Sequence, residues 1–355
     1  MAQFFIIIDI MFNCKILYLF IFVAFLSCIY NSETVKIHKK RDNIIRVREM
    51  VKEIEIEDVI ISRFARTYLI DKYLIISDTQ SSEKVIYLFD RNTFNYVTSV
   101  GNRGLGPYEI TRLMEVGINE LDRVFYASDH GKRQIFRFEL DSVVSNPNYI
   151  PKVHVKMDNL ISPHDYLSVN DTLFIGSFWL KVDEGDYRPA VGEWNMITGE
   201  KMILNKYDHP KIERKRASFA MSKEYGIFVE CYWHHDLMSI CDLNGNLKYY
   251  VYGRKWDDRT QNSINFYRDV VFCKDKIVAL FSDGELNFVE DVNGRIRSGD
   301  YPSKFIAFDL LGNYIHTLET GYQIQSFNYD IQNNRIIMVL DDEIQFAYLD
   351  LDGIL

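Results

Sequence analysis

Two Asp–His dipeptides are the first residues in this chain whose types could do chemistry. Asp129-His130 and His164-Asp165 each place an imidazole beside a carboxylate. Imidazole and carboxylate groups act as general acids and bases, and together they bind divalent cations. His130 and His164 are therefore candidate ligand-site residues, and they would suit a metal-dependent hydrolase or lyase. Because no further partner is evident, the catalytic residues stay unknown, and the sequence predicts neither a metal site nor a cofactor.

Arginines make up a second group of candidates. Arg112 and Arg268 stand near the start of apolar runs, as do Arg63, Arg66 and Arg216. A guanidinium binds carboxylates and phosphates through paired hydrogen bonds, so several arginines near one axis would bind an anionic ligand. The alternative, which we favour, is that each arginine pairs with an Asp of a neighbouring structural repeat. Arg112 and Arg268 are nevertheless kept as candidates for ligand binding.

The composition is typical of a globular β-protein and argues against nucleic-acid binding. Hydrophobic residues make up 47% of the 355-residue chain, and aromatic residues, which suit pleated surfaces, reach 14%. The net charge is −9, the wrong sign for a protein that must displace counterions from a nucleic acid. The chain also lacks Gly-x-Ser-x-Gly, His-Glu-x-x-His and EF-hand motifs. We therefore expect a non-enzymatic binding or scaffold module for a peptide, glycan or protein partner.

The elements that would position these residues come from a repeat. A pair of β-rich runs, separated by a polar turn, recurs six times and ends near an Asp or Asn. The first runs of the pairs are Tyr73–Asp78, Arg123–Asp129, Thr172–Phe178, Gly226–Tyr232, Lys276–Asp283 and Arg335–Asp342. Self-similarity with a period of about 40–50 residues is typical of a propeller. The sequence therefore predicts an all-β fold, a six-bladed β-propeller of four-stranded antiparallel blades over residues 44–355.

Each blade needs an inner strand before the recurring pair and an outer strand after it. The inner-strand candidates are Ala65–Ile70, Arg112–Ile118, Asp165–Val169, Ala217–Met221, Arg268–Cys273 and Gln325–Ile331. Outer strands are evident for five blades, so the last blade must be completed by the N-terminal part of the chain. We expect a strand within Glu49–Asp58 to pair with Glu343–Leu349, because an open sheet edge is a liability. The long spacing in blade five predicts insertions at Gly253–Phe266 and Gly284–Pro302.

A glycine-rich run, residues 100–110, connects the first two blades. Its sequence Gly101-Asn102-Arg103-Gly104-Leu105-Gly106-Pro107-Tyr108-Glu109 resembles runs in NHL-repeat and TolB-like six-bladed propellers, which are common among lipoproteins of Bacteroidetes. In those families the run recurs in several blades and has Gly where Tyr108 stands, whereas here it is clear once. The resemblance implies the fold and says little about a ligand. Arg103 and Glu109 could pair locally or face the channel, and both are candidates for ligand binding.

The N-terminal part of the chain has the features of an export signal. A basic residue precedes the apolar stretch Ile16–Leu26, and Leu26-Ser27-Cys28 resembles a bacterial lipobox. We expect a signal peptide over residues 1–28 with cleavage before Cys28, lipidation of Cys28, and a polar tether over residues 29–43. The protein would then be a lipoprotein of the cell envelope, in the outer membrane or facing the periplasm. An uncleaved membrane anchor is the alternative.

Overall fold

The computed structural model describes most of the chain from residue 34 onward. The described residues are 34–157, 161–170, 172–184, 186–204, 209–212, 215–257, 266–282, 288–290, 296–298 and 301–355. The expected signal peptide, Cys28 and the first residues of the expected tether lie outside these ranges. Within them, no helix is long and apolar enough to cross a membrane.

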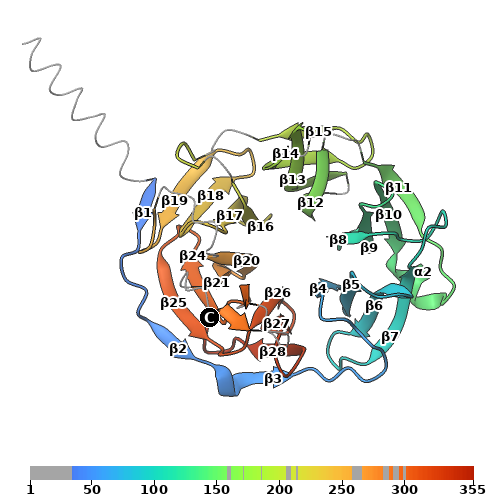
Figure 1. Ribbon diagram of the computed structural model, residues 1–355, viewed down its shortest axis with the longest axis horizontal. Coiled ribbons are helices and arrows are strands. Elements are labelled where there is room, and N and C mark those ends of the chain that lie inside the picture. The colour runs from blue at the N-terminus through green and yellow to red at the C-terminus, as the bar shows by residue number, and fades with distance from the viewer. Residues whose placement is uncertain are drawn as a thin grey trace, which may run out of the picture.

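Six β-sheets stand as blades around a central channel (Figure 1). Blade 1 consists of β4 (Ala65–Ile70), β5 (Tyr73–Asp78), β6 (Lys84–Asp90) and β7 (Tyr96–Asn102). Blade 2 consists of β8 (Leu113–Asn119), β9 (Val124–Asp129), β10 (Gln134–Glu139) and β11 (Lys152–Lys156). Blade 3 consists of β12 (Ile161–Ser168), β13 (Leu173–Asp183), β14 (Asp186–Asn195) and β15 (Lys201–Ile203).

The remaining blades repeat this plan. Blade 4 consists of β16 (Ala217–Ser222), β17 (Ile227–Tyr232), β18 (Leu237–Asp242) and β19 (Leu247–Tyr252). Blade 5 consists of β20 (Tyr267–Cys273), β21 (Lys276–Phe281), β24 (Lys304–Asp309) and β25 (Tyr314–Glu319). Blade 6 contains β26 (Ile324–Asp330), β27 (Arg335–Leu340) and β28 (Phe346–Asp350). The predicted all-β six-bladed propeller is confirmed, and every predicted inner strand overlaps with the first strand of its blade.

The N-terminal residues 34–54 run along the outer edges of three blades, and we call them the strap (Figure 1). Its first strand, β1 (Val35–Ile37), pairs in parallel with β19, and β2 (Ile44–Arg46) pairs in parallel with β25. After a short 3-10 turn, η1 (Arg48–Met50), strand β3 (Val51–Glu53) pairs antiparallel with β28 and completes blade 6. The predicted closure of the ring by an N-terminal strand is therefore confirmed.

The strap departs from two expectations. Residues 29–43 were expected to form a tether, and every blade was expected to have four strands. Strand β1 makes blade 4 five-stranded, and β2 does the same for blade 5. Between them, the His38 Nε2 donates a hydrogen bond to the Gly312 carbonyl at 2.7 Å. Arg41 Nη1 forms an ion pair of 2.7 Å with Asp236, and both side chains are buried. These contacts hold residues 34–43 against the propeller. Separating the Arg41–Asp236 ion pair would be costly, because its charges are shielded from water.

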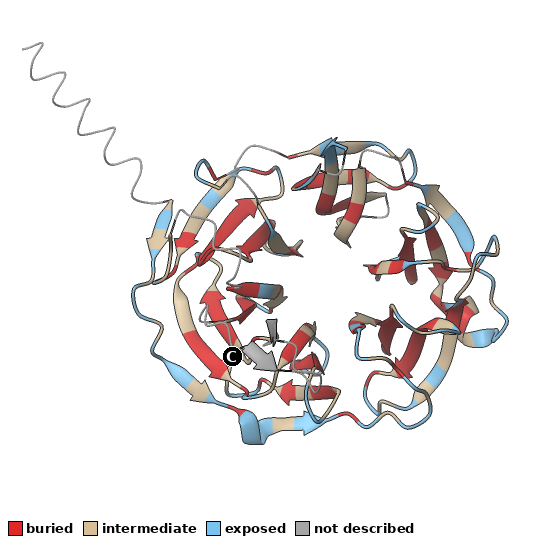
Figure 2. Cartoon of the chain, viewed as in Figure 1, coloured by how far each residue is buried: buried red, intermediate tan, exposed pale blue. Residues whose placement is uncertain are grey.

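The blades pack face to face through apolar side chains. Every residue of the second strands β5, β9, β17 and β27 is buried. These strands form the middle of their blades, where the neighbouring blades cover them (Figure 2). In the core cluster shared by blades 1 and 2, the rings of Phe125 and Phe138 stack with their centroids 4.8 Å apart. This packing explains why the recurring pairs of runs are rich in apolar residues.

Two local features add detail to the predicted pattern. The third strand of blade 2 ends at Glu139, where the short helix α2 (Leu140–Ser145) begins and buries Leu140 and Val143. The insertion in blade 5 contains a separate hairpin of β22 (Phe288–Glu290) and β23 (Ile296–Ser298), between β21 and β24. The predicted insertion between the second and third strands of blade 5 is thus confirmed.

A buried ion-pair network joins the first and last blades. The Asp330 carboxylate, which is fully buried, pairs with Arg91 Nε at 2.8 Å and with Arg335 Nε at 2.9 Å. Arg91 follows β6 of blade 1, whereas Asp330 ends β26 and Arg335 begins β27 in blade 6. The Asn333 side-chain amide donates to the same carboxylate at 2.9 Å. The network therefore fastens the seam between the blades at which the ring closes.

Candidate functional site

A cavity of about 1660 Å³ occupies the central channel. Its wall is built by the inner strands β4, β8, β12, β16, β20 and β26, so every blade contributes side chains to it. Because the blades repeat one up-and-down plan, their inner strands run in the same direction along the channel. Residues that precede these strands therefore open at one end, which we call the upper mouth. Residues that follow them open at the lower mouth.

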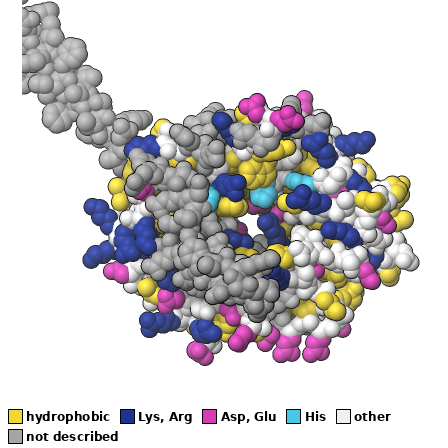
Figure 3. Space-filling model, viewed as in Figure 1, with side chains coloured by type: hydrophobic (Ala, Val, Ile, Leu, Met, Phe, Trp, Pro, Cys, Tyr) yellow, Lys and Arg dark blue, Asp and Glu magenta, His cyan; other side chains and the backbone are white. Residues whose placement is uncertain are grey.

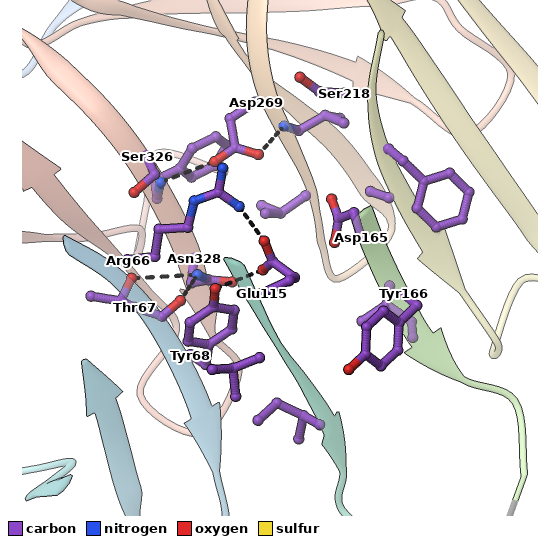
Figure 4. Close-up of a pocket in the computed structure, with 18 of the residues that line it drawn as sticks. Arg66, Thr67, Tyr68, Glu115, Asp165, Tyr166, Ser218, Asp269, Ser326 and Asn328 are labelled. Atoms are coloured by element: carbon purple, nitrogen blue, oxygen red, sulfur yellow. Dashed lines mark hydrogen bonds and ion pairs between the residues drawn. The ribbon is translucent and has the colours of Figure 1, made fainter. Parts of the chain in front are cut away.

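Four charged side chains from four blades face one another inside the channel, and we call them the waist cluster (Figure 4). They are Arg66 of β4, Glu115 of β8, Asp165 of β12 and Asp269 of β20. Arg66 forms an ion pair with Glu115, and the Tyr68 hydroxyl donates a hydrogen bond of 2.6 Å to the same carboxylate. Arg66 thus pairs with an acidic residue of the neighbouring blade. The cluster contains one positive charge and three carboxyl groups.

Burial makes the carboxyl groups of the waist cluster weaker acids. It raises the pKa of Asp269 from its usual 3.8 to about 6, although the Phe327 N–H at 3.2 Å opposes the shift. Burial, and then the charge of Glu115, raises the pKa of Asp165 well above its usual value. Burial also raises the pKa of Glu115, and Arg66 limits that rise. The cluster therefore holds protons at mildly acidic pH.

Asp269→Asn should change how stability depends on pH. Between about pH 4 and pH 6 the native Asp269 carboxyl keeps a proton that the unfolded chain has released, so native stability falls as pH rises through this window. The variant has no such proton to lose. The difference in the free energy of unfolding, variant minus wild type, should therefore increase by up to about 2 kcal/mol as pH rises from about 4 to 7. Urea unfolding at several pH values measures this difference.

Asp141→Asn provides a control of opposite sign. Asp141 is exposed, and its hydrogen bond to Arg123 lowers the pKa of its carboxyl. The wild type should therefore lose stability relative to this variant as pH falls below about 4. Parallel pH profiles for the wild type and Asp269→Asn would show that the Asp269 pKa is not raised.

Four arginines line the upper mouth, and we call them the mouth arginines: Arg103, Arg112, Arg216 and Arg268. The first two belong to the β7–β8 connection, Arg216 precedes β16, and Arg268 is the second residue of β20. Figure 3 shows Lys, Arg and His side chains around the central hollow of the face in view. Among the described residues, no carboxylate lies within 4.0 Å of any of the four guanidinium groups. Within the described part of the chain, the favoured expectation that each arginine pairs with an acidic neighbour is therefore not met for Arg112, Arg216 and Arg268.

The two candidate histidines lie on the same side of the channel but differ in their surroundings. His164 lines the cavity, whereas His130 Nε2 donates a hydrogen bond to the Pro163 carbonyl at 3.2 Å. Burial lowers the pKa of His164 to about 4, and the positive charges of Arg66 and His130 add to this effect. The His164 imidazole is therefore neutral at neutral pH.

Asp129 holds a loop and does not assist His130. Its carboxylate accepts hydrogen bonds from the backbone N–H groups of Thr111, Arg112 and Gly131, each at 2.9 Å. These bonds position Arg112 at the start of β8. Within the described ranges, no group of three His, Cys, Asp or Glu side chains is placed to hold a metal ion.

Glu109 has a local structural role in the glycine-rich run. Its carboxylate accepts the Gly106 N–H at 2.7 Å and fills the space beside Gly104 where a side chain would stand. Lys132 Nζ donates to the Glu109 carbonyl at 2.6 Å and draws the run toward blade 2. Four of the six candidates, Arg103, Arg112, His164 and Arg268, line the channel, whereas Glu109 and His130 are not among its described lining residues.

Sequence reasoning missed Glu115 and Asp269 of the waist cluster, and it noticed Asp165 beside His164 without selecting it as a site residue. Glu115, Asp165 and Asp269 each lie within a strand that was expected to face the channel. The signal that could have found them is a carboxylate inside an inner strand, where the other side chains are mostly apolar or neutral. Arg216 was noticed as an arginine at a strand start, but it was not selected as a ligand candidate.

Comparison with known proteins supports the fold. Residues 30–160 match the DUF5128 family model, described as a 6-bladed beta-propeller. No curated protein matches the chain. A solved member of the DUF4221 family from Bacteroides vulgatus is 11% identical, with 85% of this chain and 95% of that chain covered and a TM-score of 0.58. A "Putative exported protein" from Bacteroides fragilis is 9% identical, with 89% and 98% covered and a TM-score of 0.53. The chain is thus a six-bladed β-propeller that resembles DUF5128 over its N-terminal part.

Proposed function

We propose that this protein is an exported, non-enzymatic binding module whose ligand enters the central channel from the upper mouth. The observation that carries the proposal is the cavity of about 1660 Å³, to which all six inner strands contribute side chains. Concave sites lined by convergent polar groups are the usual place for ligands. The partner would be a peptide, a glycan or a segment of another protein.

Export and membrane attachment belong to the same proposal. The lipobox-like residues Leu26-Ser27-Cys28 favour a lipoprotein of the cell envelope, of the TolB-like or NHL-repeat kind. The likeness to a "Putative exported protein" supports export. Two lipid chains on Cys28 would be enough for stable attachment to a membrane. Lipid labelling should be lost in Cys28→Ser, and labelling that persists would refute lipidation at this residue.

Met114→Trp tests whether the channel is the binding site. Met114 lines the channel as a half-buried residue of β8, so the larger indole narrows the cavity without removing a hydrogen-bonding group. A ligand that binds the native state raises its unfolding temperature in a concentration-dependent way. Thermal unfolding with tetra-alanine, tetraglutamate, tetralysine, maltotetraose and cellotetraose should therefore identify at least one stabilising probe. Its effect should disappear in Met114→Trp.

Met202→Trp is the matched control for this experiment. Met202 lies on the outer strand β15 and is 55% exposed, so the same substitution there leaves the channel open. It should keep the wild-type response to every probe. Binding that survives Met114→Trp, or that is lost equally in both variants, would contradict a site in the channel.

A further inference from the structure

We infer that the upper mouth binds an acidic peptide segment through the mouth arginines Arg103, Arg112, Arg216 and Arg268. This inference rests on the proposed function, because it names the ligand class of the same channel. It starts from a local excess of positive charge on a protein whose net charge is −9.

Among the described residues, the mouth arginines have no ion-pair partner. Among the described residues that line the cavity, the carboxylates lie in the waist cluster or at the lower mouth, where Glu120 and Glu224 follow β8 and β16. The lower mouth also carries Lys223 and Lys274, so its charges are mixed. A concave site lined by one sign of charge concentrates ligands of the opposite sign. The upper mouth is therefore the end of the channel that attracts anions.

Among the mouth arginines, Arg268 is already held in place for binding. Arg268 Nε donates to the Gln325 carbonyl at 2.9 Å, and the guanidinium lies over the Tyr301 ring, 4.2 Å from its centroid. Its terminal nitrogens have no described partner and can meet a carboxylate. Arg103 Nη1 is buried without a described acceptor. A guanidinium that is already positioned loses less entropy when it binds a carboxylate, and such charge-assisted bonds are the strong ones.

The dimensions and the lining of the channel favour a peptide over a single small anion or an acidic glycan. The cavity volume of about 1660 Å³ exceeds the usual range of about 300–1,000 Å³ for small-molecule sites. Sugars are commonly held on open aromatic faces, but Arg268 occupies a face of the Tyr301 ring. The waist cluster, with three carboxylates, repels anions from the deeper channel. A chain with spaced carboxylates therefore fits best at the mouth.

Calorimetric titration of the full chain with blocked tetraglutamate tests the inference. The peptide should bind the wild type, and the dissociation constant should rise at least about tenfold in Arg112→Gln with Arg216→Gln, because two charged contacts are lost. Both side chains are exposed and lack a described ion-pair partner. The double variant should therefore unfold at the wild-type temperature or slightly above it, which separates a binding role from a structural one.

The control is Arg46→Gln with Lys248→Gln, which removes the same charge from exposed residues of the rim. It should bind tetraglutamate as the wild type does. Tetralysine should not bind, and binding of tetraglutamate should weaken between 50 and 300 mM NaCl, since salt screens exposed charges.

Titrations with two other anions test whether the carboxylates must belong to a peptide. Citrate presents the same groups on a small molecule, and tetragalacturonate presents them on a glycan. Binding of either one without tetraglutamate would overturn the peptide assignment. Tetraglutamate binding that is equal in the mouth variant and the rim control would overturn the role of the arginines. A neutral probe could bind the wild type and both arginine variants but not Met114→Trp. In that case the proposed function stands and this inference fails.

Discussion

Asp330→Ala is expected to lower the free energy of unfolding by about 3–5 kcal/mol, the cost of breaking a buried ion pair from one side. The substitution leaves two guanidinium groups, those of Arg91 and Arg335, without their shared carboxylate. Their side chains are 3% and 8% exposed, so water cannot replace the lost partner. The effect is large because the network joins blade 6 to blade 1 at the seam of the ring. Urea unfolding at neutral pH measures it.

Asp309→Ala is the matched control for this prediction. Asp309 also organises a turn after a strand, where its carboxylate accepts the backbone N–H groups of Leu311 at 2.9 Å and Asn313 at 2.8 Å. No Arg or Lys of the described chain lies within ion-pairing distance of it. Its loss should cost about 1 kcal/mol, the worth of ordinary hydrogen bonds. Equal effects of the two substitutions would show that the buried network does not stabilise the seam.

Lys52→Pro should have the second large effect, because it breaks the strand that closes the ring. Lys52 is the central residue of β3 and lies opposite Tyr348 of β28. The Ile54 N–H donates to the Phe346 carbonyl at 2.8 Å, and the alternation of an antiparallel ladder places the next such bond at Lys52. Proline has no N–H, so this bond is lost and the free energy of unfolding should fall by about 2–3 kcal/mol.

Lys52→Ala separates the backbone effect from the side-chain effect. It removes the exposed ion pair between Lys52 and Asp350, which is 2.8 Å long, but it keeps the N–H. Exposed pairs contribute about 0–1 kcal/mol, so Lys52→Ala should be close to the wild type. If the alanine and proline variants unfolded at the same urea concentration, closure through β3 would not be a major source of stability.

The repeat and its closure could be predicted because their signals are long and periodic. The second strands are rich in apolar residues because neighbouring blades cover both of their faces, and the alternation of apolar and charged residues over 51–57 indicated a strand. Strands β1 and β2 have three residues each and expose most of their side chains, so they carry no periodic signal. Their pairing depends on edges of blades 4 and 5 that lie more than 200 residues away. The polar composition of this segment therefore indicated a tether.

The candidate site was predictable in outline but not in its pairings. Arginines at the starts of inner strands must reach the channel, and the two selected ones, Arg112 and Arg268, do. Which arginine meets a carboxylate depends on the rotation between neighbouring blades, and no single-chain pattern records that rotation. Arg66 faces Glu115 across two blades, whereas Arg112 and Arg216 face open channel. Glu109 was selected for its motif, and its short contact with Gly106 could be seen only in three dimensions.

Protection of individual arginines from phenylglyoxal tests most directly whether the mouth arginines hold the ligand. The wild-type protein is modified with and without saturating tetraglutamate, and the modified peptides are quantified by mass spectrometry. Arg112 and Arg216 should be protected by the peptide, whereas Arg46 on the strap, whose side chain is 87% exposed, should react equally in both samples. Unchanged modification of Arg112 and Arg216 in the presence of bound peptide would contradict a binding site at the upper mouth.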